Sequence, residues 1–319
     1  MSATVITVTL NPAIDQTVTL DTLRPGAVNI AGAVHVNAGG KGVNVASCLA
    51  DWGVPVIASG LLGRDNAAPF ENLFADKGIR DAFIRVAGST RTNIKLVDRS
   101  TLDTTDVNLP GMSANEEALD RLQLLLDEQA DADRYVVLAG SLPAGVGDDS
   151  WAQFCRQLRS LGARVLLDSS GTALQQALAL PAAELPWLIK PNQHELEQYL
   201  GRTLASRDEL VAAARELQQR GIAVVVVSLG SDGALLCCAD GCLFAEPLTL
   251  SDIHSSVGAG DALVAGLVAA LSAQLAWPEV LRLGMAFAAA KLGQFGPNLP
   301  PRQEVCQLAE RIQIERITE

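Results

Sequence analysis

The feature that most constrains the fold is a regular alternation of short apolar runs with amphipathic segments. Residues 4–10 (TVITVTL), 134–140 (RYVVLAG) and 222–230 (IAVVVVSLG) are apolar runs with almost no polar alternation. Such runs are typical of strands in a parallel sheet that is covered on both faces. Between them, segments such as 151–162 and 208–221 have the spacing of amphipathic helices. We therefore predict an α/β fold with a central, mostly parallel sheet flanked by helices, in one domain spanning residues 1–319.

Two segments break this alternation. Residues 15–36 and 90–110 alternate polar and apolar positions, with turn residues between the runs. This pattern predicts half-exposed strands. Because both segments lie between α/β elements, we expect them to pair as a small sheet that stands off the main one. Such a sheet could act as a lid over a site or as a dimer contact. The alternative interpretation is two ordinary hairpin insertions.

Composition and charge exclude several classes of function. With 319 residues, 49% of them hydrophobic, the chain can bury a large core. The formal net charge is −12 and Lys and Arg form no cluster, which argues against a nucleic-acid partner. The beginning of the chain lacks the pattern of a secretory signal, and the apolar run at 263–277 is short for a membrane span. We expect a cytoplasmic protein with no membrane partner.

Cysteines and histidines give no signal for a metal site. The six cysteines contain no CxxC pair, and the three histidines show no ligand spacing, so we expect free thiols and no zinc. Cys238 and Cys242 could meet across a hairpin, but free thiols remain the preferred interpretation. The cysteines are Cys48, Cys155, Cys237, Cys238, Cys242 and Cys306.

The stretch 256–266 (SVGAGDALVAG) has the character of an anion-binding turn. Gly258, Ala259 and Gly260 would present backbone N–H groups at the start of an apolar helix, which suits a phosphate. Asp261 follows them, although a carboxylate repels phosphate. One interpretation is a simple helix cap. The other is phosphoryl transfer, in which the N–H groups hold the γ-phosphate and Asp261 accepts the proton of the attacking alcohol.

Three further motifs follow or precede predicted helices. Residues 37–46 (NAGGKGVNVA) form a glycine turn that is neither a Walker A loop nor a GxGxxG fingerprint after a first strand, which disfavours a nicotinamide dehydrogenase. Residues 227–236 (VSLGSDGALL) end a strand where nucleotides bind in α/β sheets. In residues 188–197 (LIKPNQHELE), the spacing of Asn192 and Glu195 favours a capping box. The alternative is a triphosphate and Mg²⁺ site.

Together these motifs, in their order and spacing over almost the whole chain, resemble the ribokinase-type (PfkB) carbohydrate kinase family. The strings TLNPAID (9–15), TRTNIKL (90–96) and GSLPAGV (140–146) are most similar to its 1-phosphofructokinase group. Tagatose-6-phosphate kinases of the same family are the close alternative, followed by 6-phosphofructokinases. The resemblance implies a ribokinase-like fold with a small β lid that often dimerises, so we expect a homodimer. It also implies ATP- and Mg²⁺-dependent phosphorylation of fructose 1-phosphate at the 6-hydroxyl. A sugar-phosphate sensor on the same fold is the non-enzyme alternative.

The resemblance assigns roles to individual residues. Asp261 aligns with the general base, Gly258, Ala259 and Gly260 align with the anion hole, and Glu195 with the acid linked to Mg²⁺, through water. The acceptor sugar phosphate is expected at Asp15, Gly39, Gly40, Lys41, Asn44, Arg91, Lys95 and Ser141. The nucleotide is expected at Lys190, Asn192, Ser228, Gly230, Ser231 and Gly233. Relatives often carry a basic residue late in the first lid segment, where this chain has only the earlier Arg24, and no string identifies an adenine pocket.

Overall fold

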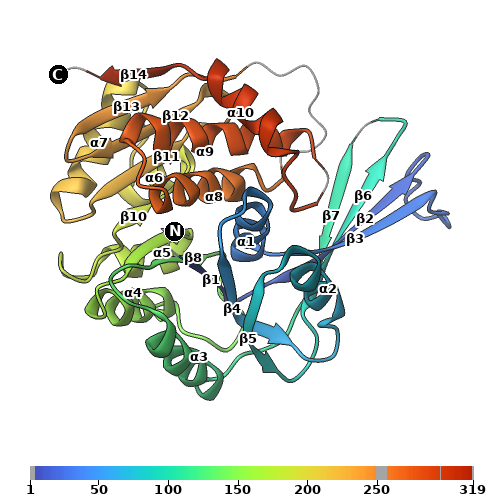
Figure 1. The fold of residues 1–319 in the computed structure, drawn as a ribbon. Coiled ribbons are helices and arrows are strands. Elements are labelled where there is room, and N and C mark those ends of the chain that lie inside the picture. Colours follow the sequence, from blue (N-terminus) through green and yellow to red (C-terminus); the bar gives the residue numbers. More distant parts are fainter. Residues whose placement is uncertain (1–3, 102, 249–256, 295, 318–319) are drawn as a thin grey trace.

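The main sheet of the computed structural model contains ten strands. The structure describes residues 4–101, 103–248, 257–294 and 296–317. The strands of the main sheet are β1 (Val5–Thr9), β4 (Val56–Gly63), β5 (Arg80–Val86), β8 (Tyr135–Ala139), β9 (Arg164–Asp168), β10 (Leu188–Ile189), β11 (Val224–Ser228), β12 (Ala234–Cys238), β13 (Gly241–Ala245) and β14 (Ile314–Ile317). They pair in the order β14-β13-β12-β11-β10-β9-β8-β1-β4-β5 (Figure 1). From β11 to β5 every neighbouring pair is parallel, and β12, β13 and β14 add an antiparallel edge. The predicted mostly parallel sheet is confirmed.

Helices cover both faces of this sheet. One face packs against α1 (Lys41–Trp52), α2 (Ala68–Lys77), α8 (Ala259–Ser272), α9 (Trp277–Leu292) and α10 (Arg302–Arg311). The other packs against α3 (Glu116–Gln129), α4 (Ser150–Ser160), α5 (Gly171–Leu178), α6 (Gln193–Leu200) and α7 (Arg207–Gln219). The neighbours Val5 and Ile6 on β1 are both fully buried, yet they belong to the two different cores. This two-sided burial explains why the strand sequences lack polar alternation.

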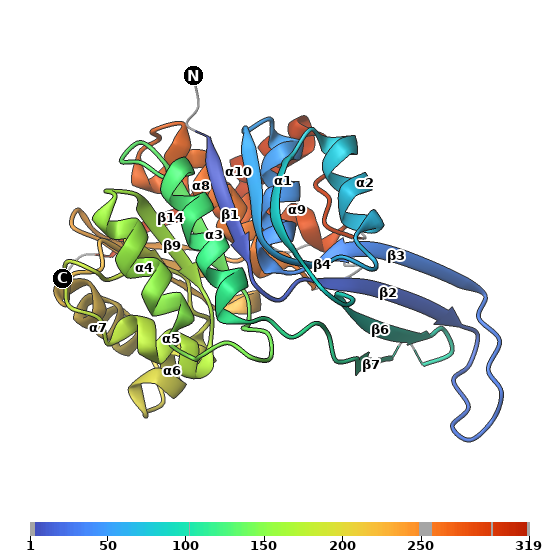
Figure 2. The ribbon, with the colours of Figure 1, turned by 90° about the horizontal axis from the view of Figure 1, so that it is seen from below.

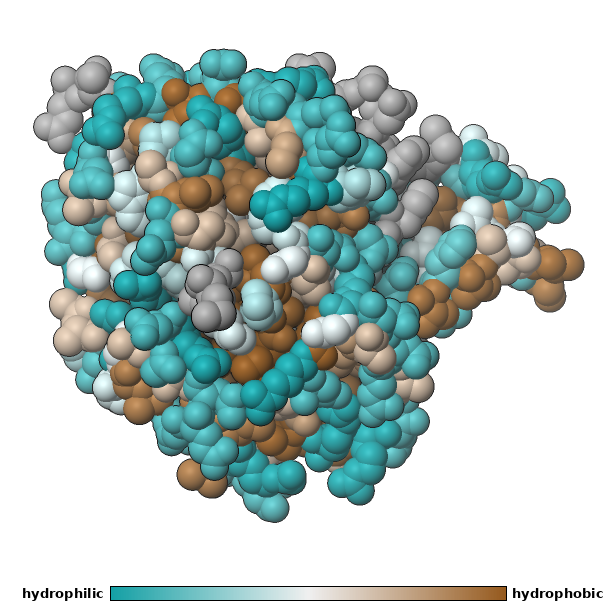
Figure 3. All heavy atoms as spheres, viewed as in Figure 1, coloured by the Kyte–Doolittle hydropathy of each residue, from teal (hydrophilic) through white to brown (hydrophobic). Residues whose placement is uncertain are grey.

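A small sheet projects from the body, as Figure 2 shows. It contains β2 (Ala13–Leu20), β3 (Ala33–Gly39), β6 (Arg91–Asp98) and β7 (Thr104–Asn108), in the order β3-β2-β6-β7. The expected pairing of the two irregular segments in a separate sheet is confirmed, with β2 and β6 running parallel. Hydrophobic residues gather at the tip and along one edge of this lid (Figure 3). They include Val28, Ile30, Val34 and Val36, with exposed fractions from 50% to 93%.

The expectation of free thiols is wrong for one pair of cysteines. Cys237 on β12 and Cys242 on β13 are register partners in an antiparallel hairpin and form a disulfide. The partner of Cys242 is not Cys238, because the short turn places Cys238 opposite Gly241. One position along a strand reverses the face that a side chain occupies. The free cysteines of the described chain are Cys48, Cys155, Cys238 and Cys306.

The described residues carry neither a candidate membrane span nor a metal cluster. No helix among them is long and apolar enough to cross a bilayer. Nor do three or more His, Cys, Asp or Glu side chains gather there in a metal-binding group. One of the three histidines, His254, and the first residue of the 256–266 stretch, Ser256, lie outside the described residues.

Candidate active site

The glycine turn at 258–260 forms the N-terminus of α8. Gly258 caps the helix in the left-handed region (φ 82°), which a side chain would disfavour, and its carbonyl accepts the N–H of Ala262 at 2.9 Å. The N–H groups of Ala259, Gly260 and Asp261 therefore have no acceptor within the helix. Together with the positive end of the helix dipole, they form a place for an anion.

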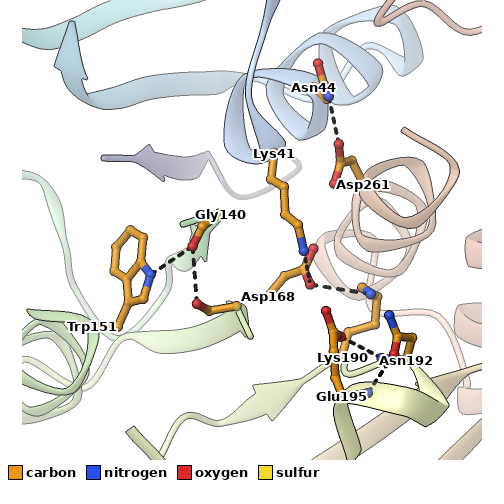
Figure 4. A network of polar contacts seen from close by, with 10 residues as sticks. Lys41, Asn44, Gly140, Trp151, Asp168, Lys190, Asn192, Glu195 and Asp261 are labelled. Carbon is orange, nitrogen blue, oxygen red and sulfur yellow. Dashed lines mark hydrogen bonds and ion pairs between the residues drawn. The ribbon is translucent and has the colours of Figure 1, made fainter. Parts of the chain in front are cut away.

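Asp261 lies in the first turn of α8 and faces α1. The side-chain amide of Asn44 donates a hydrogen bond to its Oδ2 at 2.7 Å (Figure 4). Burial raises the pKa of Asp261 to about 6, and the carboxylate of Asp168 adds to that rise, while Asn44, Lys41 and Lys190 oppose it. A carboxyl group with such a pKa can accept a proton near neutral pH more readily than an ordinary aspartate.

Asp168 holds two lysines that come from different elements. It ends β9, is 2% exposed, and its Oδ1 lies 3.1 Å from Lys41 Nζ and 3.4 Å from Lys190 Nζ (Figure 4). Burial opposes the charge on Lys41, but the carboxylates of Asp168 and Asp261 outweigh it and raise the pKa of Lys41. Lys190 is buried, and its Nζ lies 3.7 Å from the position that a Cβ on Gly260 would take. Both cations thus lie near the anion-binding turn.

No sequence motif assigned a role to Asp168. The available signal was an acidic residue directly at the end of the apolar run 164–168 (RVLLD), where α/β sheets place their ligands. The run itself contributed to the fold prediction, and only the pairing of β9 with β8 and β10 brings the carboxylate to this place.

Asn192 and Glu195 form the capping box that their spacing favours. The Glu195 N–H donates to Asn192 Oδ1, and the Asn192 N–H donates to Glu195 Oε2, both at 2.8 Å (Figure 4). A backbone bridge joins Asn192 to Ser228, so the start of α6 lies beside the end of β11. The capping interpretation is confirmed; the role toward Mg²⁺ remains a prediction.

A cavity of about 680 Å³ opens beside the start of α8. Its polar side is lined by Asn192, Ala259 and Gly260. The residues of the β11–β12 loop that were predicted to bind the nucleotide lie on the same side. Those loop residues are Ser228, Gly230, Ser231 and Gly233. The opposite wall is apolar and was not predicted, because its members come from distant segments. They are Pro247, Leu248, Leu263, Met285, Ala288, Ala289 and Leu292. The only sequence signal was the run of small residues in 285–292 (MAFAAAKL), which is equally typical of a core helix.

A second, smaller pocket lies on the other side of Gly258, toward the lid. Asp15 and Lys95 of the small sheet line it together with Asn44, Gly258 and Lys291. Burial raises the pKa of Asp15, although the hydrogen bond from Asn93, at 3.0 Å, opposes the rise. Lys95 forms an ion pair with Asp106 at 3.1 Å. The two cavities therefore flank the N-terminus of α8: Ala259 and Gly260 line the larger one, and Gly258 and Asn44, the hydrogen-bond partner of Asp261, line the smaller one.

Gly39 and Gly40 form the tight turn that leads from β3 of the small sheet into α1. A Cβ on Gly39 would lie 2.5 Å from Asp15 Oδ2, and one on Gly40 would lie 2.9 Å from Pro12 Cα. Gly40 also has φ 113°, so both positions require glycine for close approach.

Arg91 and Ser141 lie together near Asn11, to one side of the second pocket. Arg91 Nη2 donates to the Asn11 carbonyl at 3.3 Å, and Asn11 Nδ2 donates to Ser141 Oγ at 3.1 Å. Arg91 Nε is buried and has no hydrogen-bond partner in the described chain. The Gly140 carbonyl, next to Ser141, accepts from the Trp151 indole and the Ser169 hydroxyl (Figure 4). Arg24 lies in the exposed turn between β2 and β3, away from these groups.

An anion-binding helix end between two cavities, with a buried carboxyl group, defines the site of a group-transfer enzyme. The chain is a carbohydrate kinase of the PfkB family, since the model of pfkB family carbohydrate kinases matches residues 8–304. The 1-phosphofructokinase of Xanthomonas campestris pv. campestris is 52% identical over 92% of each chain. That of Rhodobacter capsulatus is 44% identical over 99% of each chain. A crystal structure of phosphofructokinase-2 from Escherichia coli in complex with potassium has a TM-score of 0.89 at 28% identity and covers 97% of this chain and 99% of its own. Membership in the family implies ATP as phosphoryl donor.

Proposed function

We propose that this chain transfers the γ-phosphoryl group of ATP to the 6-hydroxyl of fructose 1-phosphate, giving fructose 1,6-bisphosphate and ADP. The whole chain would act as one kinase domain with the small sheet as its lid, in the cytoplasm. The observation that carries the proposal is the position of Asp261, in the first turn of the helix whose N-terminus lies between the two cavities. The names of the relatives support the choice of substrate.

The roles follow from the arrangement of donors and acceptors. The larger cavity would hold ATP. Its adenine ring would lie against the apolar wall, and its phosphates would lie near Lys190, Asn192 and the β11–β12 loop. The N–H groups of Gly258, Ala259 and Gly260 would stabilise negative charge on the transferred group. Asp261 would take the proton of the sugar hydroxyl as the oxygen attacks, and Asn44 would keep its carboxylate turned toward the acceptor.

The lid side would hold the sugar phosphate. Asp15, Asn44 and the Gly39–Gly40 turn would contact sugar hydroxyls, since they line or border the second pocket. The guanidinium of Arg91 and the ammonium group of Lys95 would bind the phosphate already on the sugar. Lys41 would contact the sugar itself, and Ser141 lies near Arg91 through Asn11.

Mg²⁺ fits the donor chemistry of the site. Asp168 Oδ2 is buried and lacks a hydrogen-bond partner within the described ranges, and Glu195 supplies a second carboxylate. One or two carboxylates, waters and substrate phosphates are the usual ligands of Mg²⁺. When bound, the ion would neutralise charge on the phosphate oxygens, and these residues would hold it, Glu195 through water.

Initial rates of ADP release with Mg²⁺-ATP test the proposal. Fructose 1-phosphate, tagatose 6-phosphate, fructose 6-phosphate and unphosphorylated fructose are compared as acceptors. The highest kcat/KM with fructose 1-phosphate supports the proposed reaction. A preference for a 6-phosphate would favour a tagatose-6-phosphate kinase or a 6-phosphofructokinase. Binding of a sugar phosphate without turnover would favour a sensor.

We also propose a homodimer that forms through the lid. The apolar residues Val28, Ile30, Val34 and Val36 are exposed at its tip and edge (Figure 3). Contiguous exposed apolar surface of this kind is typical of an interface. A second copy of the lid would remove it from water.

A further inference from the structure

Lys291 is a buried cation to which neither the motifs nor the proposed reaction assigns a role. It lies in the last turn of α9, is 4% exposed, and lines the smaller pocket together with Asn44 and Gly258. A lysine is rarely this buried unless its charge is compensated. We therefore expect groups around Lys291 that compensate its positive charge.

The side chain of Lys291 connects two helix ends. Its Nζ donates to the carbonyl of Gln294 at 2.8 Å, just after α9. Its Cε lies 3.4 Å from the position that a Cβ on Gly258 would occupy, and Asn44 Nδ2 lies 3.9 Å from the same position. The lysine stem therefore passes directly against the residue that caps α8.

The electrostatic surroundings favour an anion near this ammonium. The carbonyl groups at the C-terminus of α9 stabilise a cation, but the positive N-terminus of α8 opposes it. Burial lowers the pKa of Lys291, and the carboxylate of Asp261 only partly offsets that effect. The nearby Cys48 thiol is neutral at pH 7, since burial raises its pKa to about 12. An anion bound at the start of α8 would remove the repulsion between the helix end and the ammonium.

We propose that Lys291 is a positioning residue of the kinase reaction, which holds the Gly258 turn and adds a fixed positive charge behind it. This inference rests on the proposed function. The ammonium would act through the turn rather than by touching the substrate. Negative charge accumulates on the transferred group during the reaction, so the contribution of a preorganised cation is largest at that stage.

The test compares Lys291→Met and Lys291→Gln with the wild-type enzyme. Both variants remove the charge, and glutamine keeps a donor for the Gln294 carbonyl. We expect kcat to fall by about 10-fold to 100-fold in both, less than the loss of a direct oxyanion donor. The KM for ATP should change little. Because a buried charge is costly, the thermal midpoint of the methionine variant should not fall.

Lys77→Met is the matched control. Lys77 also bonds the segment between α9 and α10, through the Pro297 carbonyl and Asn298 Oδ1, and forms an ion pair with Asp51. Its loss should lower the thermal midpoint while kcat changes less than in the Lys291 variants. Ammonium chloride should restore part of kcat in Lys291→Met, and tetramethylammonium chloride at equal ionic strength should not. Lys77→Met should show no such rescue.

Two outcomes would overturn the proposal. One is a folded Lys291→Gln enzyme with kcat within twofold of the wild type. The other is an equal loss of kcat in the Lys77 and Lys291 variants, with no recovery in ammonium chloride. That result would mean that Lys291 only anchors the loop. If the wild type has no turnover, the proposed function fails separately, and calorimetric binding of inorganic phosphate still tests Lys291. Unchanged phosphate affinity in Lys291→Gln would then contradict the inference.

Discussion

Asn44 and Asp261 are 217 residues apart in the sequence, yet the Asn44 amide lies 2.7 Å from the Asp261 carboxylate. The contact joins the first turns of α1 and α8, and each of these helices begins at a glycine turn. The hydrogen bond holds one oxygen of the Asp261 carboxyl group toward α1.

Replacing Asp261 by Asn should remove the general base and leave the fold intact. Asparagine has nearly the same shape and can still pair with Asn44. We expect kcat to fall by about 10²–10⁴, with the KM for ATP little changed. Steady-state kinetics measure the effect, and circular dichroism confirms folding. An undiminished kcat in the folded variant would remove Asp261 from the mechanism.

The pH dependence of the wild type should report the same carboxyl group. Because the base must be ionised, kcat/KM for the sugar phosphate should rise with pH through an apparent pKa of about 6. The folded pKa lies above the ordinary value of 3.8, so the contribution of Asp261 to stability is present below pH 3.8 and is lost as pH rises through about 6. The thermal midpoint of the wild type should therefore fall relative to that of Asp261→Asn as the pH rises from about 4 to about 6, and the difference should stay constant at higher pH. A profile without an inflection between pH 5 and 7 would argue against this role.

Asp168→Asn should destabilise the protein and impair catalysis together. The substitution leaves Lys41 and Lys190 without their shared carboxylate, and Lys190 is buried. Removing one partner of a buried ion pair lowers the free energy of unfolding by about 3–5 kcal/mol. Because Lys41 is partly exposed to water, we expect a loss near the lower value. Urea denaturation measures it. A variant as stable as the wild type would mean that the lysines find other partners.

Arg91→Ala should raise the KM for fructose 1-phosphate and leave the KM for ATP unchanged. Arg91 Nε is buried without a partner in the described part of the chain, so the guanidinium has a free donor for a phosphate. Losing a charged hydrogen bond of about 1.5–3 kcal/mol predicts a KM roughly 10-fold to 100-fold higher. A rise in the KM for ATP instead would place Arg91 on the other ligand.

The lid interface can be tested by placing a charge in it. Val34→Asp and Val36→Asp should convert the proposed dimer to a monomer, because each buries a carboxylate in the apolar contact. Light scattering after size-exclusion chromatography measures the mass. Leu124→Asp, at an exposed position on α3, is the control that should leave the mass unchanged. A monomeric wild type would contradict the proposal.

Much of the fold can be predicted from the sequence, because strands buried on both faces and amphipathic helices leave local patterns. The apolar run that becomes β11 and the polar alternation of β2 are both visible in contiguous residues. The glycine turns are likewise visible, since a left-handed φ such as that of Gly258 depends on a single residue type.

The sequence by itself thus determined the layered α/β fold, the separate small sheet and the glycine turn at the start of α8. Only the tertiary structure decided that Asp168 joins Lys41 to Lys190, that apolar residues from distant segments form the wall of the larger cavity, and that Cys237 rather than Cys238 faces Cys242. It also decided that Lys291 packs against Gly258. The physical reason is that strand order and register bring remote residues together, whereas local propensity acts only within a few residues of the chain.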